Sequence, residues 1–205
     1  TYTSLTVSVN GKTAYRLKNT RFYNVIANIY TLKNGQPFLY LYAPAENGDG
    51  PVCALLKYTN GKFRKILDFT EIMAGYGDHR IGEVTNLNGN KIVITESIVS
   101  YSLGINAINF TYEYVNRKFV PTSRYGSYKE IYSADGSSRY FTVNSDLPAY
   151  ARPGATAVNT TLKTGSLTKI IKCALINRKM YIQLECDGEI SVSYTHLTLP
   201  TNSRV

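Results

Sequence analysis

The feature that most constrains this chain is a tight-turn dipeptide, Asn-Gly, that recurs between runs of strand-forming residues. It occurs at Asn10-Gly11, Asn34-Gly35, Asn60-Gly61 and Asn88-Gly89. A two-residue type I′ hairpin turn needs positive φ at both central residues, which Asn followed by Gly adopts readily. The flanking runs are rich in Val, Ile, Thr, Tyr and Phe, which suit a pleated, half-buried surface. We therefore expect an antiparallel hairpin at each site and an all-β fold.

Two further dipeptides, Asn116-Arg117 and Asn177-Arg178, lie between similar runs and predict turns of the same kind. Helical periodicity, by comparison, extends over only short segments of the sequence. The best candidate for a helix is the segment 69–74, which Gly75-Tyr76-Gly77 closes.

An internal repeat organises the first two thirds of the chain. Residues 30–40 correspond to 84–94, and residues 56–63 correspond to 112–119, so the offset is 54 to 56 residues. Each unit supplies strand, tight turn, strand, longer loop, strand, tight turn and strand. Four antiparallel strands in about 50 residues is the layout of a β-propeller blade. We predict blade-like units at about 25–70 and 79–125, within a repeat region that covers residues 1–132.

These units are too few for a closed propeller. Two units and a partial hairpin at 3–17 fall short of the roughly four to eight blades that propellers contain. Three arrangements stay open: an open stack of blade-like sheets, a propeller with further blades in sequence ahead of this chain, or a sandwich built by duplication. In each of them the units must pack on one another or on other sequence, because exposed apolar surface costs about 25 cal/mol per Å².

A turn-rich, weakly hydrophobic stretch at 133–138 separates the repeat region from a second segment, 137–191. That segment has an aromatic and Pro-Gly loop at 147–154 and a Leu-x-x-Gly pattern that leads into a strand at 162–171. Met180-Tyr181 lies in the hairpin that follows. This order of features resembles a bacterial SH3 domain of the SH3b type.

The resemblance implies a small barrel with a groove that binds cell-wall peptide or Pro-rich peptide, with Tyr150, Arg152 and Tyr181 on the groove. The family's closing Gly-Trp-hydrophobic strand has no counterpart here, so we expect a truncated barrel with an unpaired edge. A small five-stranded barrel without a ligand groove is the alternative.

The end of the chain is of a different kind. The run Val-Ser-Tyr-Thr-His-Leu-Thr-Leu-Pro-Thr, from residue 192, is similar to the translation of a transposase sequencing adapter. We expect residues 192–205 to be non-native and the natural protein to continue beyond about Ile190; a natural polar tail is the alternative. His196 then drops out of any catalytic argument. The chain has no visible signal peptide, and it reads as a trimmed form or a fragment.

The charge balance favours anionic partners without naming one. The chain has 23 Lys and Arg against 14 Asp and Glu, a net charge of +9. Its densest basic run, Lys62, Arg64 and Lys65, alternates with apolar residues and is expected to be a solvated strand face rather than a nucleic-acid site. No apolar run approaches the roughly 20 residues of a transmembrane helix.

The catalytic inventory is small. The chain has three cysteines, Cys53, Cys173 and Cys186. A two-residue turn at 177–178 places Cys173 opposite Ile182, so Cys186 lies about 13 Å further along, beyond the roughly 7 Å that a disulfide spans. We expect all three to pack as small hydrophobic residues. No spacing predicts a zinc site, a cofactor motif or a nucleophile elbow.

Two short segments are weaker candidates for a site. Asp78-His79-Arg80 holds an acid beside a histidine, although adjacent residues on a strand point to opposite faces. The segment 46–50 has the composition of a calcium loop but lacks its alternating carboxylates. We expect both to be ordinary surface loops.

Together these observations predict a non-enzymatic protein without cofactor or metal. We expect an extracytoplasmic bacterial protein, extracellular or in the cell envelope, whose SH3b-like segment binds cell-wall peptidoglycan, through its peptide or its glycan. The alternative is an accessory, targeting piece of a larger cell-wall hydrolase whose catalytic domain lies outside this chain.

Overall fold

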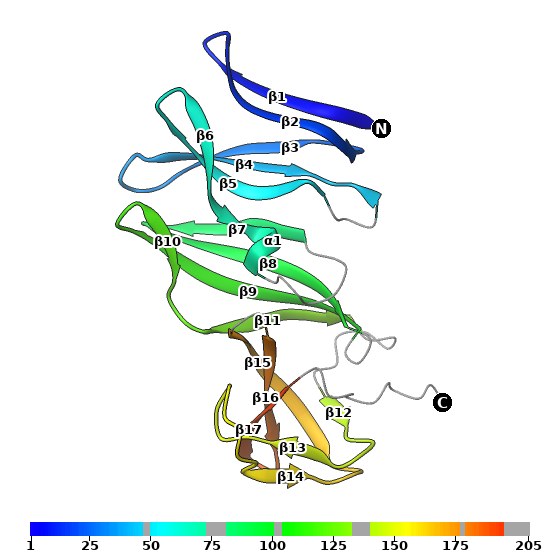
Figure 1. The fold of residues 1–205 in the computed structure, drawn as a ribbon. Coiled ribbons are helices and arrows are strands. Elements are labelled where there is room, and N and C mark those ends of the chain that lie inside the picture. The colour runs from blue at the N-terminus through cyan, green and yellow to red at the C-terminus, as the bar shows by residue number, and fades with distance from the viewer. Residues whose placement is uncertain (47–49, 73–80, 101–103, 133–139, 177–178, 195–205) are drawn as a thin grey trace. The chain divides into compact units, whose positions relative to one another are not determined.

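The computed structural model describes residues 1–46, 50–72, 81–100, 104–132, 140–176 and 179–194. These residues form antiparallel strands and a single helical turn, α1 (Phe69–Ile72), which confirms the all-β class (Figure 1). The chain divides into an N-terminal unit, drawn from residues up to 96 and from 111–122, and a C-terminal unit, drawn from 97–110 and from residue 123 onward.

Two strands, β8 (Lys91–Ser100) and β9 (Gly104–Val115), contribute to both units. The other strands of the N-terminal unit are β1 (Tyr2–Val9), β2 (Lys12–Phe22), β3 (Ile26–Thr31), β4 (Pro37–Ala43), β5 (Val52–Thr59), β6 (Lys62–Asp68), β7 (Ile81–Asn88) and β10 (Lys118–Pro121). Those of the C-terminal unit are β11 (Tyr125–Tyr132), β12 (Tyr140–Thr142), β13 (Leu147–Ala149), β14 (Thr160–Leu162), β15 (Leu167–Ile176), β16 (Lys179–Cys186) and β17 (Glu189–Tyr194).

The first predicted repeat contains a four-stranded antiparallel sheet. Strands β3, β4, β5 and β6 pair in sequence order, each with the next. In the second repeat, β7, β8 and β9 are neighbours in one sheet, and β10 pairs with β9. Each repeat therefore supplies four strands joined as successive hairpins. The sheets are open in the part of the chain that the structure describes, and closure into a propeller stays a prediction.

Three of the predicted turns have the expected backbone. Both central residues have positive φ at Asn10-Gly11 (49° and 76°), at Asn60-Gly61 (52° and 78°) and at Asn116-Arg117 (51° and 64°), as type I′ turns require. Each of them joins two directly paired strands. The turn predicted at 177–178 lies outside the described residues.

The other two Asn-Gly sites form hairpins with different turns, so the type I′ prediction is wrong there. At residue 35 only the glycine has positive φ, and the loop is longer, since Thr31 pairs with Pro37. The Asn34 side chain accepts a hydrogen bond from the Gln36 amide (3.0 Å), and this local bond favours a wider Asx-type loop. Asn88 instead belongs to β7, and Gly89 is the first residue of the turn.

The core of the N-terminal unit has two layers, one on each face of the β3–β6 sheet. On the first face, the β1–β2 hairpin lies against the sheet through partly buried side chains, namely Leu5, Val7, Tyr15 and Leu17. They cover a buried cluster of Phe22, Leu39, Leu41, Ala43, Val52, Ala54 and Leu56. On the second face, Phe38 and Tyr40 contact aromatic rings of Tyr114, Phe119 and Phe69.

Helix α1 is held at its start by Asp68, whose Oδ1 accepts hydrogen bonds from the Thr70 amide (3.2 Å) and the Thr70 hydroxyl (2.7 Å). This is the usual role of Asp at a helix N-terminus. Phe69 is fully buried by the second layer of the core. The predicted helix at 69–74 is thus present as far as Ile72, and residues 73–80 lie outside the described residues.

The C-terminal unit is built on neighbouring strands β11, β15, β16 and β17, with β12 added on β15. The β13–β14 hairpin joins the end of β17 through a bridge between Tyr150 and Val192, whose amides and carbonyls bond reciprocally at 2.7 and 2.9 Å. Cys173 pairs with Ile182, as the sequence predicted.

We expected a truncated barrel that ended at residue 191. Strand β17 instead continues to Tyr194, and the side chains of Val192 and Ser193 are buried. The reason is local: Val192 is bonded to Tyr150 on one side and pairs with Gln183 on the other. The first three residues of the expected tail are therefore part of the sheet, and a closed SH3-type barrel stays a prediction.

Candidate functional site

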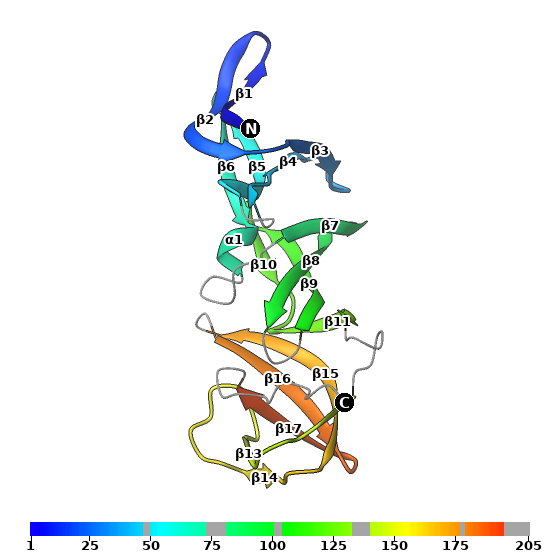
Figure 2. The same cartoon turned by 90° about the vertical axis from the view of Figure 1, so that its right-hand side faces the viewer.

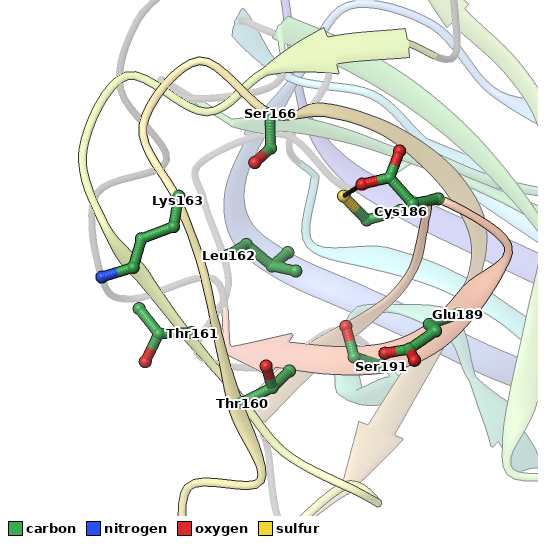
Figure 3. Close-up of a pocket in the computed structure, with 9 residues that line it drawn as sticks. Thr160, Thr161, Leu162, Lys163, Ser166, Cys186, Glu189 and Ser191 are labelled. Carbon is green, nitrogen blue, oxygen red and sulfur yellow. Dashed lines mark hydrogen bonds between the residues drawn. The ribbon is translucent and has the colours of Figure 1, made fainter.

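A cavity of about 370 Å³ opens in the C-terminal unit, between β14, the turn that follows it, and the β16–β17 hairpin (Figure 3). Its volume lies in the range of small-molecule sites, roughly 300 to 1,000 Å³. The lining is mostly polar and consists of Thr160, Thr161, Leu162, Lys163, Ser166, Cys186, Asp187, Glu189 and Ser191. Hydroxyl groups and carboxylates thus outnumber apolar side chains around the opening.

Strand register brings the walls of this cavity together. Ala149 pairs with Thr160, and the adjacent Tyr150 forms the bridge to β17. Residues 160 and 191 therefore lie close together, although they are far apart in the sequence. Ser191 also pairs with the fully buried Leu184, so its side chain lies on the inner face of β17.

The turn between β16 and β17 supplies the acidic side of the opening. Asp187 and Gly188 both have positive φ (51° and 81°), which gives a two-residue turn with Cys186 opposite Glu189. The carboxylates of Asp187 and Glu189 are both exposed. The Cys186 thiol lies 3.7 Å from an Asp187 carboxylate oxygen, and burial, followed by this negative charge, raises the pKa of the thiol.

The only lysine on the wall is held away from the cavity. Lys163 Nζ donates to Asp146 Oδ2 at 2.7 Å, and Asp146 also accepts from the Thr164 amide at 3.1 Å. The hydrogen bond from Lys163 is the largest cause that lowers the pKa of the Asp146 carboxyl below its usual value. Figure 3 shows Lys163 pointing away from the other lining residues. Because both partners are largely exposed, this pair adds little stability, but it leaves carboxylates as the charges that face the opening.

Ser191 adds a buried polar group to the wall of the cavity. Its hydroxyl oxygen is buried and has no hydrogen-bond partner among the described residues. A buried hydroxyl without a partner costs about 1–3 kcal/mol, so this position carries a local cost in stability.

The residues that the SH3b resemblance implied do not line this cavity. Tyr150 pairs with Val192, which in turn pairs with Gln183, and directly paired residues share a face of a sheet. Strand alternation places Ser191 on the opposite face. Tyr181 lies two residues from Gln183 and is on the same face as Tyr150.

The structure thus puts Tyr150 and Tyr181 on one face, on the two neighbours of β17, and both side chains are half-buried. Arg152 is exposed in the turn after β13, where its carbonyl accepts from the Ala155 amide (3.2 Å). Tyr150 and Tyr181 form a second candidate surface, separate from the cavity, and Arg152 follows Tyr150 by two residues in the chain.

Sequence reasoning missed the cavity because its last wall lies at the boundary assigned to a non-native tail. One signal was present: serine recurs at positions 191 and 193, in alternation with other residues of the last strand. Both serines are buried, and Ser193 Oγ donates to the Pro148 carbonyl at 3.3 Å. Hydroxyls on the inner face of a strand are unusual enough to mark a polar interior.

The remaining candidates give no site within the described residues. The segment 78–80 and residues 47–49 of the predicted loop lie outside them. Among the residues that the structure describes, no group of three His, Cys, Asp or Glu side chains is placed to hold a metal ion. All three cysteines are free and buried.

No family model, curated protein or solved structure matches this chain. In the described part of the chain, no helix has the length and apolar character needed to cross a membrane.

The cavity predicts an order of thiol reactivity. Cys186 is the cysteine that lines an opening, whereas Cys173 is fully buried beneath paired strands. We expect a small alkylating reagent such as iodoacetamide to modify Cys186 at least about tenfold faster than Cys53 or Cys173 in native buffer, because reaction requires access to the sulfur. Peptide mass spectrometry over a time course measures this. Equal rates, or faster labelling of Cys173, would contradict the placement of the cavity.

Proposed function

We propose that the C-terminal unit is a non-catalytic binding module for the peptide part of bacterial cell wall, in an extracytoplasmic protein. The observation that carries this proposal is the composition of the cavity: two exposed carboxylates and four hydroxyl side chains, one of which is the buried Ser191 hydroxyl that lacks a partner among the described residues. Ammonium and amide groups are the natural complements of these acceptors and hydroxyls.

The negative charge at the opening favours a ligand with a cationic group. Although the chain as a whole is basic, Asp187 and Glu189 face the opening, and Lys163 is paired with Asp146. A local negative site on a positive protein favours a ligand with an amino group carried on a polymer that is otherwise anionic. Wall peptides bear free amino groups, and wall polymers bear many anionic groups. The resemblance of residues 137–191 to an SH3b domain points to the same ligand class.

The test is sedimentation of the full chain with purified peptidoglycan, together with titration of a soluble muropeptide followed by calorimetry. We expect the double variant D187N/E189Q to bind the muropeptide at least about tenfold more weakly, since each lost charge-assisted hydrogen bond is worth about 1.5–3 kcal/mol. Asn at 187 keeps the turn, because Asn tolerates positive φ. The matched control, E185Q, removes a carboxylate from the other face of β16 and should bind normally.

Two results would contradict parts of this proposal in different ways. Failure of the unmodified chain to sediment with peptidoglycan would exclude wall binding altogether. Normal binding by D187N/E189Q, combined with loss of binding in Y150A/Y181A, would move the site from the cavity to the Tyr150 face. Retained binding in Y150A/Y181A removes those two tyrosines from the site.

A further inference from the structure

Strand β17 brings a carboxylate and a buried hydroxyl to the same face of the C-terminal sheet. It lies between β16 and the β13–β14 hairpin (Figure 2). Glu189 pairs with Cys186, and Ser191 pairs with Leu184. Residues two apart on a strand share a face, so Glu189 and Ser191 are neighbours about 7 Å apart along β17. Both side chains line the cavity (Figure 3).

The Ser191 hydroxyl points to a ligand in this cavity. The residue is 3% exposed, and its Oγ lacks a hydrogen-bond partner among the described residues. Buried side-chain hydroxyls in proteins are nearly always hydrogen-bonded. Because Ser191 lines the cavity, a molecule bound there that bonds to Oγ removes this unsatisfied group.

The charges around the opening select the kind of group that binds. Asp187 and Glu189 are both on the wall, while the lysine of the wall, Lys163, donates to Asp146 at 2.7 Å. The pair of Lys163 and Asp146 is neutral in sum, so the two other carboxylates determine the charge of the opening. A primary ammonium group has three N–H donors and no acceptor, which suits a hydroxyl oxygen and two carboxylates. A ligand carboxylate beside that ammonium would be repelled by Asp187 and Glu189.

We infer that the cavity binds a primary ammonium group at the end of a flexible aliphatic chain, as in a lysine side chain, and rejects one whose carbon atom also carries a carboxylate. The buried side chains of Leu162 and Cys186 supply apolar contacts for the aliphatic chain. The inference rests on the proposed function where it names the natural ligand. A wall peptide that contains lysine is bound in preference to one that contains diaminopimelic acid, which is a lysine with a carboxylate added on the carbon atom of its side-chain amino group.

Asp146 is a positioning residue for this selectivity. Its Oδ2 accepts from Lys163, and its Oδ1 accepts from the Thr164 amide (3.1 Å) and the Thr164 hydroxyl (3.3 Å). In D146N the amide oxygen can keep the bonds to Thr164, but the charge of Lys163 is no longer balanced. We expect D146N to bind a lysine side chain at least about threefold more weakly. Adding K163Q removes the unbalanced charge and should restore the affinity; failure of this rescue would overturn the role of Asp146.

The first test reads occupancy of the cavity and needs no wall material. Pentylamine and norleucine are a matched pair of probes, because norleucine is pentylamine with a carboxylate on the carbon atom that bears the amino group. Each is added to the full chain at the same concentration, and alkylation of Cys186 by iodoacetamide is followed by peptide mass spectrometry. We expect pentylamine to slow the alkylation of Cys186 at least about fivefold and norleucine less than about twofold, because a bound molecule blocks access to the sulfur. In D187N/E189Q the protection by pentylamine should be lost.

The second test uses two soluble muropeptides that differ only in lysine or diaminopimelic acid, titrated by calorimetry. The lysine form should bind at least about tenfold more tightly, and amidation of the extra carboxylate should recover most of the difference. E185Q, on the other face of β16, should keep this preference. S191A should weaken binding of the lysine form at least about threefold and yet raise the urea midpoint of unfolding, since it removes a buried unsatisfied hydroxyl.

The outcomes separate this inference from the proposed function. Equal protection of Cys186 by pentylamine and norleucine, or protection by neither, would overturn the inference even in a chain that sediments with peptidoglycan. Selective protection by pentylamine in a chain that does not sediment would support the inference and contradict wall binding. Equal binding of the two muropeptides would overturn its extension to wall peptides.

Discussion

Replacing Phe69 by Ala is expected to lower the free energy of unfolding of the N-terminal unit by about 3–5 kcal/mol, the usual cost of removing a fully buried phenyl ring. The Phe69 side chain has no exposed surface, and its ring centroid lies 5.8 Å from that of Tyr40. The single turn α1 has few internal hydrogen bonds of its own, so this ring holds it on the sheet.

The same ring explains why residue 82 is a glycine. A Cβ atom at that position would lie 2.6 Å from Phe69 Cδ2, 2.7 Å from Phe69 Cβ and 2.6 Å from a carboxylate oxygen of the buried Glu96. G82A is therefore destabilising by about 1–3 kcal/mol through overpacking. In the double variant F69A/G82A the clash with the ring is absent, whereas the close contacts with the Cβ atom of residue 69 and with Glu96 remain, so part of the overpacking is relieved. The double variant should lose less stability than the sum of the two single changes.

Urea unfolding followed by circular dichroism measures these differences; tyrosine fluorescence gives a second probe in a chain that has no tryptophan. The control is F63A, because Phe63 is only partly buried at the margin of the other core layer, and its loss should cost clearly less. Strict additivity of F69A and G82A, or a cost of F69A no larger than that of F63A, would contradict this packing.

Local signals predicted the parts of the fold that local interactions determine. Asn60-Gly61 adopts the type I′ turn because two residues fix its backbone, and the pairing of Cys173 with Ile182 follows from strand length and one turn. Asn34-Gly35 differs because an Asx hydrogen bond from its own side chain competes with the tight turn. These outcomes depend on contacts within a few residues of each position.

The cavity depends on a contact that no local pattern contains. Its walls meet because Tyr150 bridges to Val192, and this bridge joins segments separated by three strands. The polar side chain of Ser191 acquires its inward direction only once the register of β17 is known. The resemblance to a family implied Tyr150 and Tyr181 by analogy, and these residues occupy the opposite face from the cavity.

Raising the pH above 9 is expected to destabilise the N-terminal unit, because a buried thiol and a buried phenol must both keep their protons in the folded state. The Tyr40 hydroxyl donates to the Gly82 carbonyl at 2.6 Å, and the Cys53 thiol donates to the same oxygen at 3.2 Å. Burial raises the pKa of Cys53 to about 12, and burial, followed by the neighbouring thiol, raises the pKa of Tyr40 well above its usual range.

The direction of this pH effect follows from the difference between the pKa of the thiol in the folded state and its pKa in the unfolded state. A cysteine in the unfolded chain loses its proton near pH 9, whereas folded Cys53 keeps its proton until about pH 12. The stabilisation is therefore complete below pH 9 and is lost as the pH rises from 9 toward 12. Within this window one such group lowers the free energy of unfolding by about 1.4 kcal/mol per pH unit, and Tyr40 adds to the loss above pH 10.

The measurement is the free energy of unfolding in urea at several pH values between 8 and 11. The variant C53A should be less stable than the unmodified chain below pH 9, and its stability should fall less steeply above pH 9, because one titrating group is absent. C186A is the control: its thiol lies at an opening in the other unit, so the slope for the N-terminal unit should match that of the unmodified chain. The slope of the unfolding free energy against pH can be compared between variants of different overall stability, because it depends on the number of protons released on unfolding. An identical slope in C53A and the unmodified chain would mean that Cys53 does not retain its proton in this pH range, and that the shared acceptor at Gly82 does not couple folding to ionisation.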